Sequence, residues 1–149
     1  MDKKRQTRTL ARAEREEVAT LSAEIQKEYS PVIIKEPAKT LAMIKQRDPV
    51  KCGTFYIGEV IVCEASVEID GVTGISVLMG DDTDKTLDMA IIDAAINKGV
   101  FTGMETLLAL EEKQQCTLMQ ENALCLKTMV NFESMDQEAP SDLNAFKKA

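Results

Sequence analysis

The residues of this sequence that could do chemistry are carboxylates, because the chain contains no histidine. That absence excludes Ser-His and Cys-His nucleophiles, proton transfer by imidazole and every zinc site that needs a histidine ligand. The first candidate is Glu59, which in a β-strand would lie on the same face as Ile57 and Ile61. A carboxylate buried alone is costly, so we expect Glu59 to be ion-paired within the chain or to face a cleft or a partner. Gly58 leaves a further alternative, a β-bulge that turns Glu59 outward.

Aspartates supply the other candidates. Asp93 interrupts an apolar helical stretch, and a structural hydrogen bond to backbone or to a basic residue is favoured for it. Asp81, Asp82 and Asp84 follow Gly80 and could hold a divalent cation through oxygen ligands. The cluster lacks the terminal glutamate of an EF-hand loop, and capping of the following helix explains it without a metal. Neither a Walker-type nor a G-x-G-x-x-G phosphate loop occurs, so we expect the chain to hold no metal and no cofactor of its own.

Composition narrows the class of protein further. The chain has 149 residues, of which 44% are hydrophobic and 29% charged, as is typical of one globular domain. Aromatic residues make up 4% and the net charge is −7, which disfavours a nucleic-acid partner. No apolar run is long enough to span a membrane, and no secretory signal follows the basic N-terminus. The four cysteines form no C-x-x-C pair, which favours free thiols in the cytoplasm.

Basic residues are concentrated at the N-terminus. Residues 1–15 hold six basic and two acidic side chains, a net charge of +4, so the rest of the chain carries −11. Such a segment is expected to dock by charge onto the acidic body of its own chain or onto a partner. A solvated basic helix face is the alternative.

The elements that must position these residues follow from the apolar spacing. Steps of three and four residues over 5–28 predict one N-terminal helix, which ends before Pro31. Strands are predicted over 32–34, 40–45, 55–69 and 72–79, with a break at Pro37 and a hairpin turn at Asp70-Gly71. Helices are predicted over 83–97 and 102–122, followed by a strand over 128–132.

This order of elements predicts an α+β fold. We expect an antiparallel β-sheet with a long central hairpin, helices packed on one face, and the N-terminal helix as an arm. Residues 1–132 are expected to form a single domain, and residues 133–149 a frayed tail.

A series of short motifs gives the chain a resemblance to a known family. The series comprises Phe55, Ile57-Gly58-Glu59-Val60, Glu64-Ala65, Gly71, Gly74, Gly80-Asp81 and Asp93-Ala94. An opening helix with Arg8 and Arg12, the break at Pro37 and a closing run of Thr128, Val130, Phe132 and Met135 complete it. In this order the motifs resemble the PhnG family, a small subunit of the bacterial carbon–phosphorus lyase system for phosphonate use. Cys63 stands where the family usually has threonine, and residues 105–125 are less rich in arginine and alanine, which could alter a partner-facing surface.

The resemblance implies a non-catalytic core subunit of the carbon–phosphorus lyase complex. Family members act with PhnH, PhnI and PhnL, and together they displace adenine from MgATP with an alkylphosphonate to give a ribose 1-alkylphosphonate 5-triphosphate. The nucleosidase chemistry is ascribed to PhnI, and the radical lyase step to PhnJ. MgATP is therefore expected as a substrate of the assembled complex only. The candidate partner- or ligand-facing residues are Gly58, Glu59, Glu64, Gly80, Asp81, Asp82 and Asp93.

Two expectations about assembly and activity accompany this assignment. The long hairpin and the basic arm predict that the isolated chain self-associates, as a dimer. The competing function is a stand-alone hydrolase that uses Glu59, Asp81 and Asp82 as carboxylate or metal-binding groups.

Overall fold

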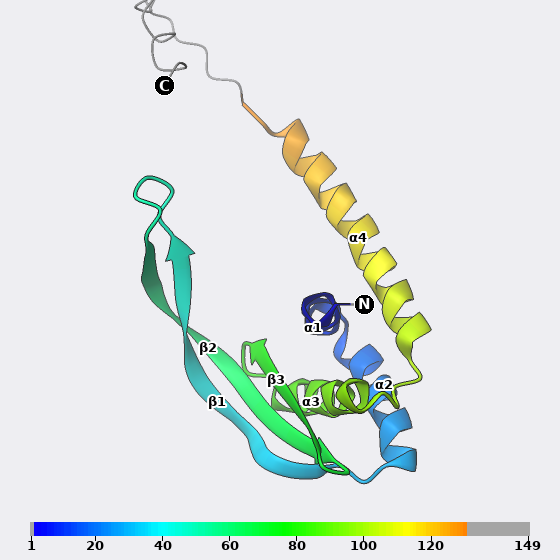
Figure 1. Cartoon of the computed structure of the whole chain (residues 1–149). Helices are drawn as coiled ribbons and strands as arrows, with labels where there is room; N and C mark the ends of the chain where they lie inside the picture. Colours follow the sequence, from blue (N-terminus) through cyan, green and yellow to red (C-terminus); the bar gives the residue numbers. More distant parts are fainter. Residues whose placement is uncertain (1, 131–149) are drawn as a thin grey trace, which may run out of the picture. The chain divides into compact units, whose positions relative to one another are not determined.

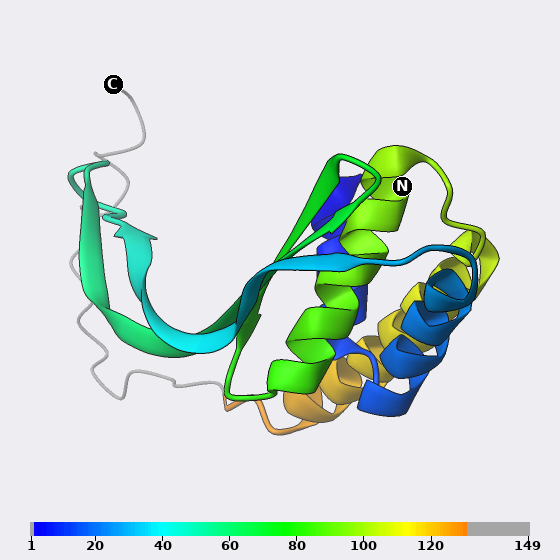
Figure 2. The same cartoon turned by 90° about the horizontal axis from the view of Figure 1, so that it is seen from below.

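The computed structural model describes residues 2–130 and shows the predicted α+β fold. Its elements are α1 (Lys3–Arg12), α2 (Arg15–Glu28), β1 (Val32–Arg47), β2 (Thr54–Ile69), β3 (Val72–Met79), α3 (Thr83–Lys98) and α4 (Met104–Lys127). The three strands form an antiparallel sheet in the order β1-β2-β3 (Figure 1). Helices α1, α2 and α3 lie on one face of this sheet (Figure 2). The chain divides into two compact units, residues 1–115 and 116–149, and the sheet belongs to the first.

The N-terminal helical segment consists of two helices, so the prediction of one helix over 5–28 is wrong. Ala13 is extended, with φ −65° and ψ 155°, and separates α1 from α2. Glu14 and Glu17 form a capping box at the start of α2, in which the Glu14 amide donates to the Glu17 carboxylate at 3.0 Å. The Lys85 ammonium, from α3, donates to the carbonyls of Ala11 at 2.8 Å and Ala13 at 2.7 Å. These partners satisfy backbone groups that an uninterrupted helix would bond internally.

The two short strands predicted on either side of Pro37 are one strand, β1. The pairing of β1 with β2 shifts register between Ile33 and Lys35 and again between Lys35 and Ala38, so the strand passes Pro37 through an irregularity. A proline is tolerated there because β1 is at the edge of the sheet, where a missing amide need not break a ladder.

The hairpin between β2 and β3 forms as predicted. Asp70 and Gly71 both have positive φ, 48° and 83°, which is the backbone of a two-residue type I′ turn. Ile69 pairs with Val72 across it. The turn fixes the register of the second half of β2, where the odd positions Cys63 to Ile69 are buried.

Helix α3 is the central core helix, as its nearly continuous apolar sequence predicts. Ala90, Ile92, Ala94 and Ala95 are fully buried. The helix begins at the N-cap Asp82 and ends at Gly99, whose φ is 80°. It approaches β3 closely at Gly74.

The last described residues differ from the prediction. Helix α4 confirms the helix predicted over 102–122 and continues to Lys127, with Leu107 and Leu110 in the core of the first unit. Thr128–Val130 form no strand; the amide of Thr128 donates to the carbonyl of Cys125 at 3.1 Å and extends the last helical turn. The remainder of the predicted strand and the predicted tail over 133–149 lie outside the described residues. Among those that are described, no helix is long and apolar enough to cross a membrane.

Candidate partner-binding surface

Strands β1 and β2 continue together past the end of β3. The last residue of β3, Met79, pairs with Val62, whereas β1 and β2 remain paired from Leu41 with Ile61 to Arg47 with Thr54. We call this two-stranded extension, residues 41–47 with 54–61, the ribbon; it projects beyond α3 (Figures 1 and 2). No residue of the ribbon is buried. A two-stranded hairpin with neither face covered is marginally stable in water, so the ribbon is a segment that benefits from a partner.

The ribbon is also apolar. On the face that continues the helix-covered side of the sheet, Leu41 is 61% exposed, Met43 59% and Ile61 55%. Large apolar side chains continue toward its tip, where Phe55, Tyr56 and Ile57 are exposed. Contiguous exposed apolar side chains mark interaction surfaces in proteins.

The position of Glu59 resolves the question of its burial. The pairs Ile44 with Gly58 and Lys45 with Tyr56 leave Ile57 as an extra residue in β2, a bulge directly before Gly58. Glu59 lies opposite Met43 on the ribbon and is exposed. Among residues 2–130 it has neither a hydrogen-bond nor an ion-pair partner. Its carboxylate is accessible because the ribbon lacks a cover, and a role in binding stays a prediction.

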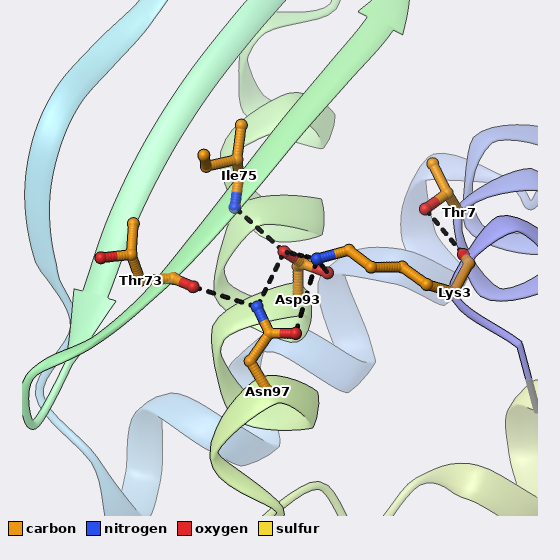
Figure 3. A network of polar contacts seen from close by, with 6 residues as sticks. All are labelled: Lys3, Thr7, Thr73, Ile75, Asp93 and Asn97. Atoms are coloured by element: carbon orange, nitrogen blue, oxygen red, sulfur yellow. Dashed lines mark hydrogen bonds and ion pairs between the residues drawn. The ribbon is translucent and has the colours of Figure 1, made fainter.

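Asp93 has the structural role that the sequence favours (Figure 3). Its carboxylate accepts hydrogen bonds from the backbone amide of Ile75 in β3 at 3.0 Å and from the ammonium of Lys3 in α1 at 3.1 Å. Asn97, one turn further along α3, donates to Asp93 at 3.2 Å and to the Thr73 carbonyl at 3.0 Å. The network therefore joins α1, α3 and the outer edge of β3.

The acidic turn before α3 is occupied by structural contacts. Gly80 has φ 108° and donates its amide to the Ile61 carbonyl at 3.1 Å. Asp82 caps α3 by accepting from the Lys85 amide at 3.0 Å, Asp81 pairs with Lys39 at 3.3 Å, and Asp84 pairs with Arg15. Within residues 2–130, no group of three or more histidine, cysteine, aspartate or glutamate side chains is placed to hold a metal ion. Helix capping and ion pairing thus account for this cluster.

The described part of the basic N-terminal segment, residues 2–15, docks by charge onto the chain itself. The Arg5 guanidinium donates to both oxygens of Glu111 at 2.9 and 2.8 Å. This hydrogen bonding raises the pKa of Arg5 and lowers the pKa of Glu111. Lys3 pairs with Asp93, and Arg15 with Asp84. The sequence left open whether this segment docks onto its own chain or onto a partner. The described contacts are with acidic residues of the chain itself.

Burial is the largest influence on the pKa of one carboxylate, Asp88. Burial between α2 and α3 raises the pKa of Asp88, and a hydrogen bond from Ser22 acts in the opposite direction.

The seven sequence-predicted residues do not converge on one site. Gly58 and Glu59 lie on the ribbon, Glu64 pairs with Lys35 at 2.7 Å on the face of the sheet away from α3, and Gly80 to Asp82 form the turn before α3. Asp93 follows Asp82 by eleven helical residues, about 16 Å along the axis. Asp81 pairs with Lys39 and Asp82 caps α3, and no group of three acidic side chains within residues 2–130 is placed to hold a metal ion. These contacts give no support to a hydrolytic site that combines Glu59, Asp81 and Asp82.

Two structurally important residues, Lys85 and Asn97, escape a reading of the sequence, and the packing role of a third, Gly74, was not drawn from it. Lys85 and Asn97 bond backbone atoms of other elements, and nothing in their neighbouring residues signals those long-range contacts. Gly74 carries a signal, because an isolated glycine inside a strand indicates a close backbone approach. That signal locates a packing contact rather than a ligand site.

Comparison with known proteins agrees with the motif series. No curated protein matches the chain. The family described as "Phosphonate metabolism protein PhnG" matches residues 1–137, which includes the sheet, the ribbon and all four helices. The chain therefore belongs to the PhnG family of phosphonate metabolism proteins.

Proposed function

We propose that this chain is a non-catalytic core subunit of a cytoplasmic carbon–phosphorus lyase complex. Its partners are subunits of the PhnH, PhnI, PhnJ and PhnL types. The assembled complex acts as a transferase that converts MgATP and an alkylphosphonate into adenine and a ribose 1-alkylphosphonate 5-triphosphate. The chain contributes binding surface to that complex and needs no cofactor of its own.

The observation that carries the proposal is the exposed ribbon. A surface built only for solvent would expose few large apolar side chains in one place, yet Leu41, Met43 and Ile61 share one uncovered face. Burying about 100 Å² of apolar surface on a partner contributes roughly 2.5 kcal/mol. A few such side chains therefore favour assembly strongly enough to order the ribbon.

The same face accounts for the expected behaviour of the chain without its partners. Two copies can cover the apolar side chains of each other's ribbons, so we expect the isolated chain to form dimers at tens of micromolar. Light scattering measures this directly, and a strict monomer at that concentration would count against an adhesive ribbon.

The decisive experiment compares two leucine variants of the full chain. Leu41→Ser removes an apolar side chain from the ribbon, and Leu108→Ser removes an exposed leucine from α4 as a matched control. Each variant is co-expressed with PhnH-, PhnI-, PhnJ- and PhnL-type partners, and the purified assembly is assayed for phosphonate-dependent release of adenine from MgATP. We expect Leu41→Ser to lower both assembly and adenine release, and Leu108→Ser to leave both near the wild-type level. Equal behaviour of the two variants would contradict binding through the ribbon.

Glu59→Gln tests the carboxylate on the same surface. Because Glu59 is exposed and without a partner in the described residues, the isolated variant is expected to melt as the wild type does. A loss confined to assembly or adenine release places the counterpart of Glu59 on a partner subunit or on its bound nucleotide. Wild-type melting, assembly and turnover together would show a solvated side chain.

A further inference from the structure

The two outer edges of the sheet are treated differently. At the β3 edge, the Thr73 carbonyl accepts from Asn97 and the Ile75 amide donates to Asp93, so side chains of α3 occupy backbone groups that another strand would need (Figure 3). At the opposite edge, β1 pairs only with β2 among the described residues. An edge strand presents a row of amides and carbonyls that can pair with another chain.

We propose that β1 accepts an extended, acidic segment of a partner polypeptide as a fourth strand, over residues 38–47. This inference rests on the proposed function, and it specifies how one of the partners is bound. The range begins after the irregular stretch around Pro37, and β1 continues through it without an inserted residue, since the bulge at Ile57 belongs to β2. Strand addition supplies affinity through main-chain hydrogen bonds and specificity through alternate side chains.

The side chains of this stretch fit an incoming strand. Leu41 and Met43 lie on one face and Ile44 on the other, and all three are exposed. A partner strand with apolar residues at alternate positions would place them beside these side chains on both faces. Such an addition turns the two-stranded ribbon into a three-stranded sheet, which is the smallest sheet expected to be stable by itself.

Charge indicates the chemistry of the partner. Lys45 and Arg47 are exposed and have no acidic partner within residues 2–130. Lys35 and Lys39, earlier on the same strand, pair with Glu64 and Asp81. Two uncompensated cations beside an open edge favour a strand that carries aspartate or glutamate opposite them.

The same charges disfavour a second copy of this chain at the edge. An antiparallel pairing of two β1 strands centred on Met43 places Lys39 of each copy opposite Arg47 of the other. Moving the centre to Ala42 places Lys39 opposite Lys45. Like charges directly opposite each other destabilise a strand pair, so the dimer expected for the isolated chain uses the apolar face of the ribbon instead of this edge.

Amide hydrogen exchange tests the inference at the backbone. The full chain is measured alone and in the assembly co-expressed with its PhnH-, PhnI-, PhnJ- and PhnL-type partners. We expect alternate amides between residues 38 and 47, those that point away from β2, to exchange roughly tenfold or more slowly in the assembly.

A pair of charge variants tests the chemistry of the partner. Lys45→Glu with Arg47→Glu reverses the charge beside the edge, and Lys4→Glu with Arg8→Glu makes the same change of charge on the exposed face of α1. The edge variant is expected to weaken assembly by about tenfold or more, whereas the α1 variant stays within about twofold of wild type.

The outcomes separate this inference from the proposed function. A stable assembly in which the amides of residues 38–47 exchange as fast as in the free chain overturns strand addition and leaves the subunit role intact. A wild-type chain that fails to assemble with any of these partners overturns the proposed function, and strand addition with it. Alternate protection that appears in the isolated chain and grows with its concentration identifies a second copy as the occupant and also overturns the inference.

Discussion

Gly74→Ala is the substitution whose cost the structure defines most sharply. Gly74 lies inside β3, where the backbone of α3 crosses the strand. A Cβ atom at this position would lie 2.3 Å from the carbonyl oxygen of Ala90 and 2.3 Å from the amide nitrogen of Ala94. Both obstacles are backbone atoms of a buried helix, so no side-chain rotation can relieve the overlap.

The expected cost follows from the shift that the methyl group demands. Carbon and oxygen approach to about 3.3 Å at the closest, so α3 and β3 must separate by roughly 1 Å. Overpacking of this kind costs about 3 kcal/mol at the upper end of its usual range, and a gap of about 1 Å weakens the neighbouring dispersion contacts. Replacing glycine by alanine also stiffens the unfolded chain, which offsets roughly 0.5–1 kcal/mol. We therefore expect the free energy of unfolding to fall by about 2 kcal/mol.

Gly58→Ala is the matched control. It makes the same chemical change on the ribbon, where a Cβ atom would meet nothing within 4 Å and φ is not positive. Only the effect on the unfolded chain remains, so this variant is expected to be neutral or more stable by less than about 1 kcal/mol. Urea unfolding followed by circular dichroism, at one fixed protein concentration, gives both values. A free energy of unfolding for Gly74→Ala within about 0.5 kcal/mol of wild type would refute the close packing of α3 on β3.

Two further predictions concern carboxylates of α3. Asp93→Ala is expected to lower the free energy of unfolding by about 2 kcal/mol, because hydrogen bonds to a charged group are lost. Lys3→Ala is expected to lower it by less than about 1 kcal/mol, because Lys3 is exposed. Equal urea midpoints for the two variants would contradict this difference. Burial raises the pKa of Asp88 above its ordinary value of 3.8, so the folded state binds the proton of Asp88 more tightly than the unfolded state does. The stability that this proton contributes is fully present below the unfolded-state pKa and is lost as the pH rises through the folded-state pKa. Asp88→Asn is therefore expected to be more stable than wild type at neutral pH, and the difference is expected to disappear in acid. Urea midpoints of the two proteins that differ by the same amount at neutral and at acid pH would contradict this expectation.

Local patterns were sufficient where the deciding contacts are local. The Asp70-Gly71 turn, the caps of α3 at Asp82 and Gly99, and the alternation in the second half of β2 each depend on residues close in sequence. The structure confirms the predicted hairpin turn and the predicted capping of α3 within the acidic cluster. The alternation is uninformative in the first half of β2, because residues 54–61 are exposed or only partly buried at odd and even positions alike.

The wrong predictions share a dependence on distant partners. The break at Ala13 is supported by Lys85, which is 72 residues away, and the passage of β1 through Pro37 requires knowing that β1 is an edge strand. For the candidate site, the motif series identified the family but did not locate a surface. Glu59 was singled out on the assumption of a buried face, and the structure shows an exposed one.

The contrast between the two sheet edges bears on how a small subunit remains specific. A free strand edge pairs with other strands largely through its backbone, so each open edge is also a route to aggregation. Here Asp93 and Asn97 occupy outward backbone groups of β3, and Lys3 compensates the charge of Asp93. The edge of β3 is thus occupied, whereas the edge of β1 stays open, and Lys45 and Arg47, which have no acidic partner within residues 2–130, lie beside it. Charge can then select among strands that the backbone alone would accept, because a cationic edge repels its own copy and attracts an acidic segment.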